Sequence, residues 1–545
     1  MICGLFLGLF AQESSPPSEN PCPNIVWISV EDMSPWLGCY GDHTVPTPHV
    51  DALAARGTRF TRAYANAPVC APARATLITG CYATAIGAMH MRTGKPSNAA
   101  LARNPGAYDG IPSYEAVPPP EVRCFPELLR KAGYWCTNNS KTDYQFKAPL
   151  TVWDQSGRKA HWKNRTDPDQ PFFAVFNLTI THESGTFPGT RRRPEVVDPS
   201  KVTVPPYWPD TPVVRTDIAR TYDNIAAMDA KVGELVEELK DAGLLETTVI
   251  FFFSDHGVGL PRGKRCIYDS GTRVPLVVCR PGGSTSVSHR PVSFVDFAPS
   301  VLSFAGIEAQ PWMVGRAFAG PHKKPGTGLV FFHADRMDAE LDRTRAVADG
   351  RYRYVRNYMP EKPRIYPVAY AESIPMTAEI HALRASGEST PAQWQVVDPG
   401  KPAEELYDTS ADPHEVENLI ANPEMTEVAS RLRVALEGWI EETGDLGLLE
   451  ENEMLRERLQ PLTGGPVLTA VPCLGSDRLG NAWFTSDTPG ASIGWRWKGE
   501  AGWRPFSEPF QLESGKTLQA IAHRIGFRSS AVVDYNLSKE PRKGE

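Results

Sequence analysis

One segment of this 545-residue chain reads Cys70-Ala71-Pro72-Ala73-Arg74-Ala75-Thr76-Leu77-Ile78-Thr79-Gly80. Because proline is tolerated in a first helical turn and glycine often follows a last one, the segment predicts a helix that begins near Cys70. The free N–H groups and the dipole of a helix N-terminus favour an anion, so a cysteine there can be reactive. The alternative is a buried structural cysteine, because free cysteine is among the most buried residue types.

Short apolar runs rich in β-branched and aromatic residues lie on both sides of this segment. They predict buried strands over residues 24–30, 172–178, 249–253 and 274–279. Segments that each end at a glycine predict helices over residues 48–56, 126–132 and 216–242. Strands that alternate with helices indicate an α/β domain with a mainly parallel sheet.

The character of the sequence changes after this domain, which we expect to span residues 24–325. Strands around an Asp349-Gly350 turn and a helix over residues 424–442 predict a smaller α+β subdomain, residues 326–455. In residues 461–545, tryptophans stand among short alternating strands and glycine-rich turns, which predicts an appended β-sandwich. Exposed tryptophans would favour sugar binding by this sandwich, and a spacer packed on the rest of the chain is the plainer interpretation.

The chain starts with an apolar run, residues 1–12, that has the length of a signal-peptide core and is too short to span a bilayer. We therefore expect residues 1–23 to be a signal peptide and linker. The protein would then be exported, to the periplasm or the medium, with no transmembrane segment. A frayed terminus is the alternative interpretation.

Charge and cysteine usage argue against two kinds of partner. The net charge is −7 and there is no basic tract, which argues against binding to nucleic acid. The ten cysteines include no Cys-x-x-Cys pair, so a zinc site is not expected. Cys124 and Cys136 form one plausible disulfide, a pairing that sequence alone cannot establish.

Three of the predicted strands are followed by polar residues that suit catalysis, namely Glu31-Asp32, His182 and Asp255-His256. Ligands of open α/β sheets bind beyond the carboxyl ends of the strands, so we expect these groups to converge. Carboxylate oxygens are hard ligands that suit calcium or magnesium. Each group taken singly is more typical of a turn or a helix cap.

The order of these groups, together with Cys-x-Pro-x-Arg and Thr-Gly in residues 70–80, resembles the type I, formylglycine-dependent sulfatases of the alkaline-phosphatase-like superfamily. The resemblance runs from Asn24 to about Asn418. The segments most similar to bacterial heparan N-sulfatase-like sulfatases are residues 87–92, 335–338 and 353–358. The resemblance implies an α/β/α sandwich around a mainly parallel mixed sheet. It also implies a cysteine that a sulfatase-maturing enzyme oxidises to formylglycine.

The resemblance implies a role for each group. One divalent ion, Ca2+ or alternatively Mg2+, would be bound by Glu31, Asp32, Asp255, His256 and the modified Cys70. The sulfate oxygens would be held by Lys141, Lys264 and His182, and Arg74 would orient the hydrated aldehyde. One hydroxyl of that hydrate attacks sulfur and the other loses its proton to expel sulfate, which an unmodified thiol cannot do.

Two parts of the expected site are less regular. The family's Gly-Lys-x-His reads Ser140-Lys141-Thr142-Asp143 here, so Asp143 stands in the place of a histidine. Asp143 is a candidate base, with a substrate contact as the alternative, and Lys141 by itself could be a solvated surface lysine. Basic residues beside aromatic ones nominate His90, Arg92 and Arg336 for the substrate pocket, although Met and His at this spacing are more often core.

The predicted function is hydrolysis of a sulfate ester or sulfamate on a sulfated glycan, such as a glycosaminoglycan. A phosphate or phosphonate ester hydrolase on the same fold is the first alternative, because fold-level resemblance cannot separate the two activities. The second alternative is a non-catalytic glycan-binding protein whose cysteine is never modified. An intact set of metal ligands and lysines argues against it, because binding alone does not require a nucleophile.

Overall fold

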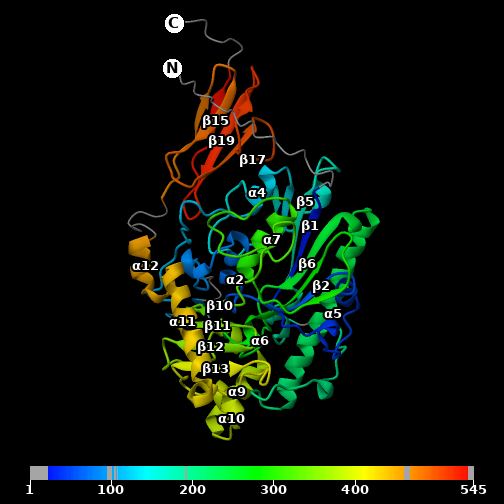
Figure 1. Cartoon of the computed structure of the whole chain (residues 1–545), viewed down its shortest axis with the longest axis vertical. Coiled ribbons are helices and arrows are strands. Elements are labelled where there is room, and N and C mark those ends of the chain that lie inside the picture. The colour runs from blue at the N-terminus through cyan, green and yellow to red at the C-terminus, as the bar shows by residue number, and fades with distance from the viewer. Residues whose placement is uncertain are drawn as a thin grey trace, which may run out of the picture.

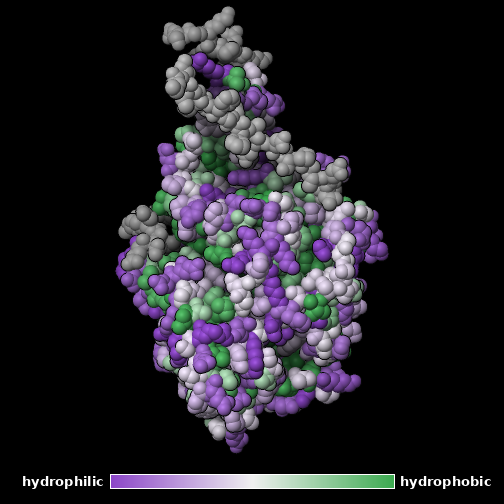
Figure 2. Space-filling view, in the orientation of Figure 1, coloured by the Kyte–Doolittle hydropathy of each residue, from purple (hydrophilic) through white to green (hydrophobic). Residues whose placement is uncertain are grey.

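The computed structural model describes residues 22–94, 101–102, 106, 108–190, 193–458 and 467–537. Residues 1–21, which contain most of the predicted signal peptide and linker, lie outside the described part. Among the described helices, none combines the length and the apolar character that crossing a membrane requires. Figure 2 shows hydrophilic residues spread over the visible face, with hydrophobic residues in small groups between them.

A nine-stranded mixed sheet lies at the centre of the molecule (Figure 1). Its strands follow the order β4-β3-β5-β1-β6-β7-β2-β8, and β9 lies beside β2. They are β1 (Asn24–Val30), β2 (Thr58–Tyr64), β3 (Trp135–Asn139), β4 (Gln155–Ser156), β5 (Phe172–Leu178), β6 (Thr248–Ser254), β7 (Arg273–Cys279), β8 (Ser286–Ser288) and β9 (Val292–Ser293). β1 runs parallel to β5 and β6, whereas β7 runs antiparallel to β6 and β2. The mainly parallel mixed sheet is therefore confirmed.

The four strands expected from the sequence are β1, β5, β6 and β7. β2 and β3 were not expected, because polar residues such as Thr58, Thr61 and Asn138 interrupt their apolar pattern. These segments form strands because each pairs with a buried neighbour, β2 with β7 and β3 with β5. Position in the sheet therefore outweighs the local hydrophobic pattern.

Alternate residues of β1 point into two separate cores. Ile25 and Trp27 belong to the core shared with α2 (Cys70–Thr79), α4 (Pro126–Lys131) and α7 (Phe297–Phe304). Val26 and Ile28 belong to the core shared with α1 (Pro48–Ala54) and α5 (Pro212–Asp241). The sheet therefore carries helices on both faces, which is the expected α/β/α sandwich.

A second sheet is antiparallel and has the order β10-β11-β12-β13. Its strands are β10 (Val330–Ala334), β11 (Thr344–Ala348), β12 (Tyr352–Asn357) and β13 (Glu404–Asp408). One face is covered by α11 (Thr426–Thr443), from which Leu432 and Trp439 pack on Val347 and Tyr354. The other described α-helices are α6 (Asp269–Thr272), α8 (Ala369–Glu372), α9 (Pro375–Ser386), α10 (Pro391–Val397) and α12 (Glu451–Arg458).

Two small antiparallel sheets form the C-terminal sandwich. One contains β14 (Cys473–Ser476), β15 (Asn481–Thr485) and β18 (Phe510–Gln511). The other contains β16 (Ser492–Trp497), β17 (Arg504–Pro505), β19 (Thr517–His523) and β20 (Val533–Asn536). Phe484 from the first sheet packs with Trp497 and Leu518 from the second. Figure 1 shows this sandwich at one end of the molecule, next to α4.

The expected disulfide between Cys124 and Cys136 is wrong, because both residues are buried free thiols. Sγ of Cys136 points toward the backbone carbonyl of Pro126 at 3.8 Å. Both cysteines belong to the core that contains α4. They pack as small apolar side chains, which is the usual role of a buried cysteine.

Candidate active site

Residues from four neighbouring strands meet at one edge of the central sheet. Glu31-Asp32 follow β1, Lys141 follows β3, His182 follows β5 and Asp255-His256 follow β6. Because these strands are parallel neighbours in the order β3-β5-β1-β6, their carboxyl ends lie side by side. The structure thus brings together the groups whose convergence the sequence predicts.

Cys70 reaches this edge in the first turn of α2. All ten residues of α2 are buried, as expected for a helix that is apolar on every side. Sγ of Cys70 lies 3.3 Å from Nε2 of His256 and 4.0 Å from Oδ1 of Asp32. These three atoms lie within 4.8 Å of one another. The packing of α2 therefore fixes the thiol beside a carboxylate and an imidazole.

Arg74 lies one turn after Cys70 on the same face of α2 and is only 4% exposed. Its Nη2 is 2.9 Å from Oδ2 of Asp255 and 3.5 Å from Oε1 of Glu31. Its Nη1 donates to Oδ1 of Asn177 at 2.7 Å. Arg74 therefore holds two carboxylates beside Cys70 and balances part of their charge.

Two lysines reach the site from different loops. Nζ of Lys141 lies 2.6 Å from Oε1 of Glu31, and the lysine side chain is 22% exposed. Nζ of Lys264 donates to Oδ2 of Asp32 at 2.8 Å and lies 3.4 Å from Nε2 of His182. Both lysines are largely buried and paired, which contradicts the surface alternative for Lys141.

Opposite charges control protonation in the site. Burial alone would raise the pKa of the Asp32 carboxyl, but Lys264 and two histidines hold that pKa well below its usual range. Burial would lower the pKa of the His256 imidazole, but Asp255 and Asp32 raise it to about 10. In the metal-free site Asp32 is therefore ionised and a protonated His256 balances part of the carboxylate charge, and a bound cation would displace that proton from the imidazole.

The donor set fits a bound cation. The buried carboxylate of Asp32 meets the imidazole of His256 and the thiol of Cys70. The buried carboxylates of Asp255 and Glu31 lie beside them, on the guanidinium of Arg74. Nε2 of His256 lies 3.0 Å from Oδ1 of Asp32 and 3.7 Å from Oδ1 of Asp255, so these donors share one small volume. A donor set rich in carboxylate oxygens suits Ca2+ or Mg2+.

A cavity of about 640 Å³ opens onto this cluster. Its walls include His182 and Lys264 of the cluster and also Arg92, Asp143 and Tyr370. The ring centroids of His182 and Tyr370 lie 6.0 Å apart. The cavity thus joins the sulfate-binding candidates to a space large enough for a small organic group.

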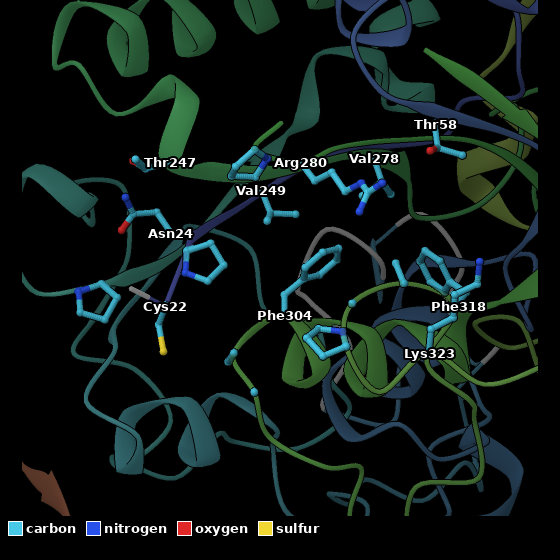
Figure 3. A pocket seen from close by; sticks show the side chains of 18 of the residues that line it. Cys22, Asn24, Thr58, Thr247, Val249, Val278, Arg280, Phe304, Phe318 and Lys323 are labelled. Carbon is cyan, nitrogen blue, oxygen red and sulfur yellow. The ribbon is translucent and has the colours of Figure 1, made fainter. Parts of the chain in front are cut away.

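A larger cavity, of about 1480 Å³, lies at the opposite edge of the sheet (Figure 3). Asn24 and Thr58, which line it, are the first residues of β1 and β2. Of the described candidate site residues, none lines this cavity. Size alone is a poor guide here, since ligands of open α/β sheets bind at the carboxyl ends of the strands.

Comparison with known proteins assigns this arrangement to a family. Residues 23–307 match the family model described as Sulfatase. The chain belongs to the sulfatase family. An ulvan-active sulfatase from Formosa agariphila is 41% identical over 95% of this chain and 91% of its own length. The N-sulphoglucosamine sulphohydrolase of Homo sapiens is 28% identical over 80% of this chain and 94% of its own length. This sulfatase is accordingly a sulfuric ester hydrolase or a sulfamidase.

Solved structures share the fold of this sulfatase. A protein in complex with its substrate D-glucosamine-2-N,6-O-disulfate has a TM-score of 0.54 at 17% identity, and the match covers 78% of this chain and 99% of that one. A phosphonate monoester hydrolase from Silicibacter pomeroyi has a TM-score of 0.56 at 17% identity, with 78% and 96% covered. At these identities the likeness shows the fold alone, which is the alkaline-phosphatase-like sandwich.

Of the three residues nominated for the substrate pocket of the sulfatase, Arg92 lines the cavity, and its half-exposed side chain lies 3.4 Å from Oδ1 of Asp143. The structure places His90 and Arg336 in the interior, where they are 1% and 2% exposed and do not line the cavity. Arg336 donates to both oxygens of Glu451, at 2.7 and 2.8 Å, and its backbone N–H donates to Nδ1 of His90 at 3.3 Å. They hold α12 against the core.

Two further residues of the sulfatase site were not expected from the sequence. Glu183 accepts hydrogen bonds from both Nη atoms of Arg265, at 2.8 and 2.7 Å, and its Oε1 lies 2.9 Å from Nζ of Lys264. Burial would raise the pKa of Glu183, but Arg265 and Lys264 lower it to about 2. Glu183 therefore fixes Lys264. The sequence offered one indication of these two residues: Glu183 directly follows His182, and Arg265 directly follows Lys264.

Proposed function

We propose that this sulfatase hydrolyses a sulfate ester or sulfamate on a sulfated glycan. The observation that carries the proposal is the convergence of Cys70, Lys141, Lys264 and His182 at one edge of the sheet, where His182 and Lys264 also line the cavity. Lysine and histidine offer hydrogen bonds and positive charge to the oxygens of a sulfuryl group. Relatives named for ulvan and for N-sulphoglucosamine support a saccharide as the rest of the substrate.

In this proposal position 70 provides the nucleophile. A formylglycine there, made from the cysteine by a sulfatase-maturing enzyme, supplies a geminal diol that a thiol lacks. Lys141 and Lys264 hold the sulfate oxygens and stabilise the negative charge that develops on them. Arg74 keeps Asp255 and Glu31 in place beside the nucleophile, as their short contacts with its guanidinium suggest.

His182 is proposed to contact the sulfate with Nε2. Burial lowers the pKa of its imidazole, which favours the neutral ring near pH 7. Nδ1 lies 2.9 Å from Oγ of Ser184, which fixes the orientation of the ring. Nε2 is then the nitrogen that faces Lys264 and the cavity.

Asp143 is proposed as the catalytic base, a role for which the family pattern has a histidine at this position. Its Oδ2 lies 3.7 Å from Nζ of Lys141 and is buried without a hydrogen-bond partner among the described residues. A carboxylate oxygen that is free of hydrogen bonds and close to the reacting groups can accept a proton.

The proposed cofactor is Ca2+, held by Glu31, Asp32, Asp255, His256 and the residue at position 70. A divalent cation held by these residues would supply Lewis-acid polarisation of an oxygen of the sulfuryl group. Calcium accepts a flexible set of oxygen ligands, so the longer arm of Glu31 suits it better than the strict octahedron of Mg2+.

Mass spectrometry and kinetics test the role of position 70. After co-expression with a sulfatase-maturing enzyme, the peptide with residue 70 should be about 18 Da lighter than its cysteine form. Cys70→Ala should abolish sulfate release while the circular dichroism spectrum and Tm stay unchanged. Cys279→Ala, which removes a buried thiol on β7, is the matched control and should retain activity. Sulfate release by Cys70→Ala would refute the assignment.

A substrate panel separates the proposal from the phosphonate alternative. Sulfate release from ulvan oligosaccharides, N-sulfoglucosamine and sulfated glycosaminoglycan fragments should be compared with product release from matched phosphate and phosphonate esters. We expect the sulfated saccharides to give the higher kcat/KM. A strong preference for the phosphonate ester would replace the proposal by the alternative activity.

Metal removal is expected to stop turnover. EDTA leaves the carboxylates of Glu31, Asp32 and Asp255 without a divalent partner, so sulfate release should be lost and Ca2+ should restore it. Added Ca2+ should also raise the Tm of metal-free protein, because an ion that binds only the folded state stabilises it. A Tm and an activity that EDTA leaves unchanged would contradict the metal assignment.

We further propose that the protein is exported and that residues 24–325, 326–455 and 461–545 are its three units. The apolar run in residues 1–12 supports export, and the separate sheets support the division. Fractionation of producing cells should find the mature protein outside the cytoplasm, with a new N-terminus near residue 23.

A further inference from the structure

Among the described residues of the C-terminal sandwich, none lines the substrate cavity, yet the sandwich touches one wall of that cavity. We call residues 114–120 and 143–147 the cavity wall. Glu115 and all of residues 143–147 line the cavity. The two segments are joined by the backbone N–H of Ala116, which donates to the carbonyl oxygen of Gln145 at 2.9 Å. A displacement of one segment is therefore passed to the other.

The backbone of the cavity wall is strained. Asp143 and Gln145 have φ values of 54° and 63°, in the left-handed region that residues with a side chain rarely adopt. Such conformations persist only where the surrounding structure holds them. Asp143 is the proposed base, so whatever holds this segment also bears on the reaction.

Two glycines of the sandwich allow it to approach the cavity wall closely. A Cβ on Gly490 would lie 2.3 Å from the carbonyl oxygen of Pro120. A Cβ on Gly526 would lie 2.5 Å from Cγ2 of Val117. Both glycines have positive φ, at 78° and 81°, so no other residue fits either the backbone or the space.

An arginine of the sandwich binds the cavity wall directly. Arg524 is 4% exposed, and Nη2 of its guanidinium donates to the carbonyl oxygen of Pro118. Among the described residues, no carboxylate lies within ion-pair distance of Arg524. Burial and the charge of Arg123 lower the pKa of its guanidinium to about 10. The charge of Glu121 acts in the opposite direction but forms no ion pair with Arg524, so the hydrogen bond to Pro118 is the direct polar contact that holds this buried guanidinium.

Two tryptophans of the sandwich, Trp495 and Trp503, have a ring face covered by other side chains, whereas Trp483 is 38% exposed. Trp495 is stacked on Phe510 with ring centroids 4.2 Å apart, and the guanidinium of Arg504 lies 4.9 Å from its ring. The guanidinium of Arg496 lies 4.2 Å from the ring of Trp503. These contacts favour a supporting role over sugar binding.

We propose that the C-terminal sandwich positions the cavity wall, with Arg524 and Gly526 as positioning residues that act through residues 116–118 on Glu115 and Asp143. The cavity wall lines the same cavity as His182 and Lys264, the residues proposed to bind the sulfate. The support that the sandwich gives to the cavity wall therefore governs how tightly the saccharide part of the substrate is bound. The kinetic consequence rests on the proposed function, whereas the effect on the cavity wall itself does not.

Arg524→Met tests this support, because it keeps an apolar side chain and removes the donor to Pro118. Amide hydrogen exchange in residues 114–120 and 143–147 should rise about tenfold, while exchange in β1 and β6 stays unchanged. KM for a sulfated disaccharide should rise about tenfold, and kcat should fall by up to about tenfold because the loosened segment carries Asp143. Lys498→Met is the control, since Lys498 is an exposed cation of the sandwich paired with Asp534, and it should change neither quantity.

Gly526→Ala is a second, independent variant with a matched control. Gly499 also has positive φ, at 101°, but a Cβ there would meet nothing within 4 Å, so Gly499→Ala carries backbone strain without a clash. Only Gly526→Ala should raise exchange in the cavity wall and KM for the disaccharide.

The outcomes separate this proposal from the proposed function. If Arg524→Met and Gly526→Ala lower Tm but leave exchange in the cavity wall and KM unchanged, the sandwich is a spacer and the proposal is overturned. If exchange in the cavity wall rises but even the wild-type protein releases no sulfate, the positioning role stands and the proposed function fails.

Discussion

At the scale of single residues, the role of a cysteine depends on its neighbours in space. Sγ of Cys70 lies 3.3 Å from an imidazole nitrogen, whereas Cys124 and Cys136 lie among apolar side chains. All three are buried and none is in a disulfide. Burial therefore does not distinguish the reactive candidate from core cysteines, and the polar atoms around the sulfur do.

Asp143→Asn tests the proposed base. Asparagine tolerates a left-handed backbone as aspartate does, so the segment should keep its conformation. Loss of the proton acceptor should lower kcat by about 10²-fold or more, with KM little changed. Steady-state sulfate release measures both constants.

The control for this prediction is Asp338→Asn. Asp338 is another carboxylate of the cavity, 4.0 Å from Nε of Arg92, and its loss should leave kcat near the wild-type value. If Asp143→Asn also retains kcat, Asp143 is a substrate contact and the base lies elsewhere.

At the scale of elements, the site is placed where the strands β3, β5, β1 and β6 end and where α2 begins, at one edge of the sheet. β19, in the C-terminal sandwich, carries a buried histidine whose protonation makes the stability of the fold depend on pH. His523 is 3% exposed, and neither ring nitrogen has a hydrogen-bond partner among the described residues. Burial, followed by the charge of Lys147, lowers its pKa from 6.5 to about 4.

His523→Leu should make the fold less sensitive to acid. Between about pH 6.5 and pH 4 the folded protein binds fewer protons at position 523 than the unfolded chain, so stability is lost as the pH falls through that window. The loss is on the order of 3 kcal/mol by pH 4 and should be absent from the variant. Tm measured from pH 7 to pH 4 should therefore fall less for His523→Leu than for the wild type.

An exposed histidine gives the comparison. His381 on α9 is 48% exposed, and His381→Gln should show the wild-type dependence of Tm on pH. A His523→Leu variant as sensitive to acid as the wild type would show that the titrating group lies elsewhere.

At the scale of the whole molecule, buried ion pairs join segments that are distant in sequence. Arg336 follows β10 and pairs through two hydrogen bonds with Glu451 at the start of α12. Arg345 on β11 pairs with Asp335 and with Asp445, and all three are buried. Such pairs fix how the second sheet and the helices around it meet the central sandwich.

Arg336→Met should lower stability without impairing catalysis. It leaves the carboxylate of Glu451, only 12% exposed, without its partner, which costs about 3 kcal/mol. The double variant Arg336→Met/Glu451→Met should lose less than the sum of the two single losses. Thermal unfolding measures the losses, and kcat of folded protein should be unchanged because Arg336 does not line the cavity. Additive losses would mean that the two side chains do not act as a pair.

Local pattern and order along the chain were enough to predict the α/β class, four strands of the central sheet and most of the cluster around Cys70. Short apolar runs mark buried strands, and polar residues just after parallel strands must meet at one edge. Tertiary structure alone decided which groups are paired and which are buried. Glu183 with Arg265, the free thiols of Cys124 and Cys136, and the burial of His90 and Arg336 depend on segments that pack together only after folding. The contact of Arg524 with Pro118 spans 406 residues. Burial and pairing depend on which residues become neighbours in the folded chain, and a short stretch of sequence does not specify those neighbours.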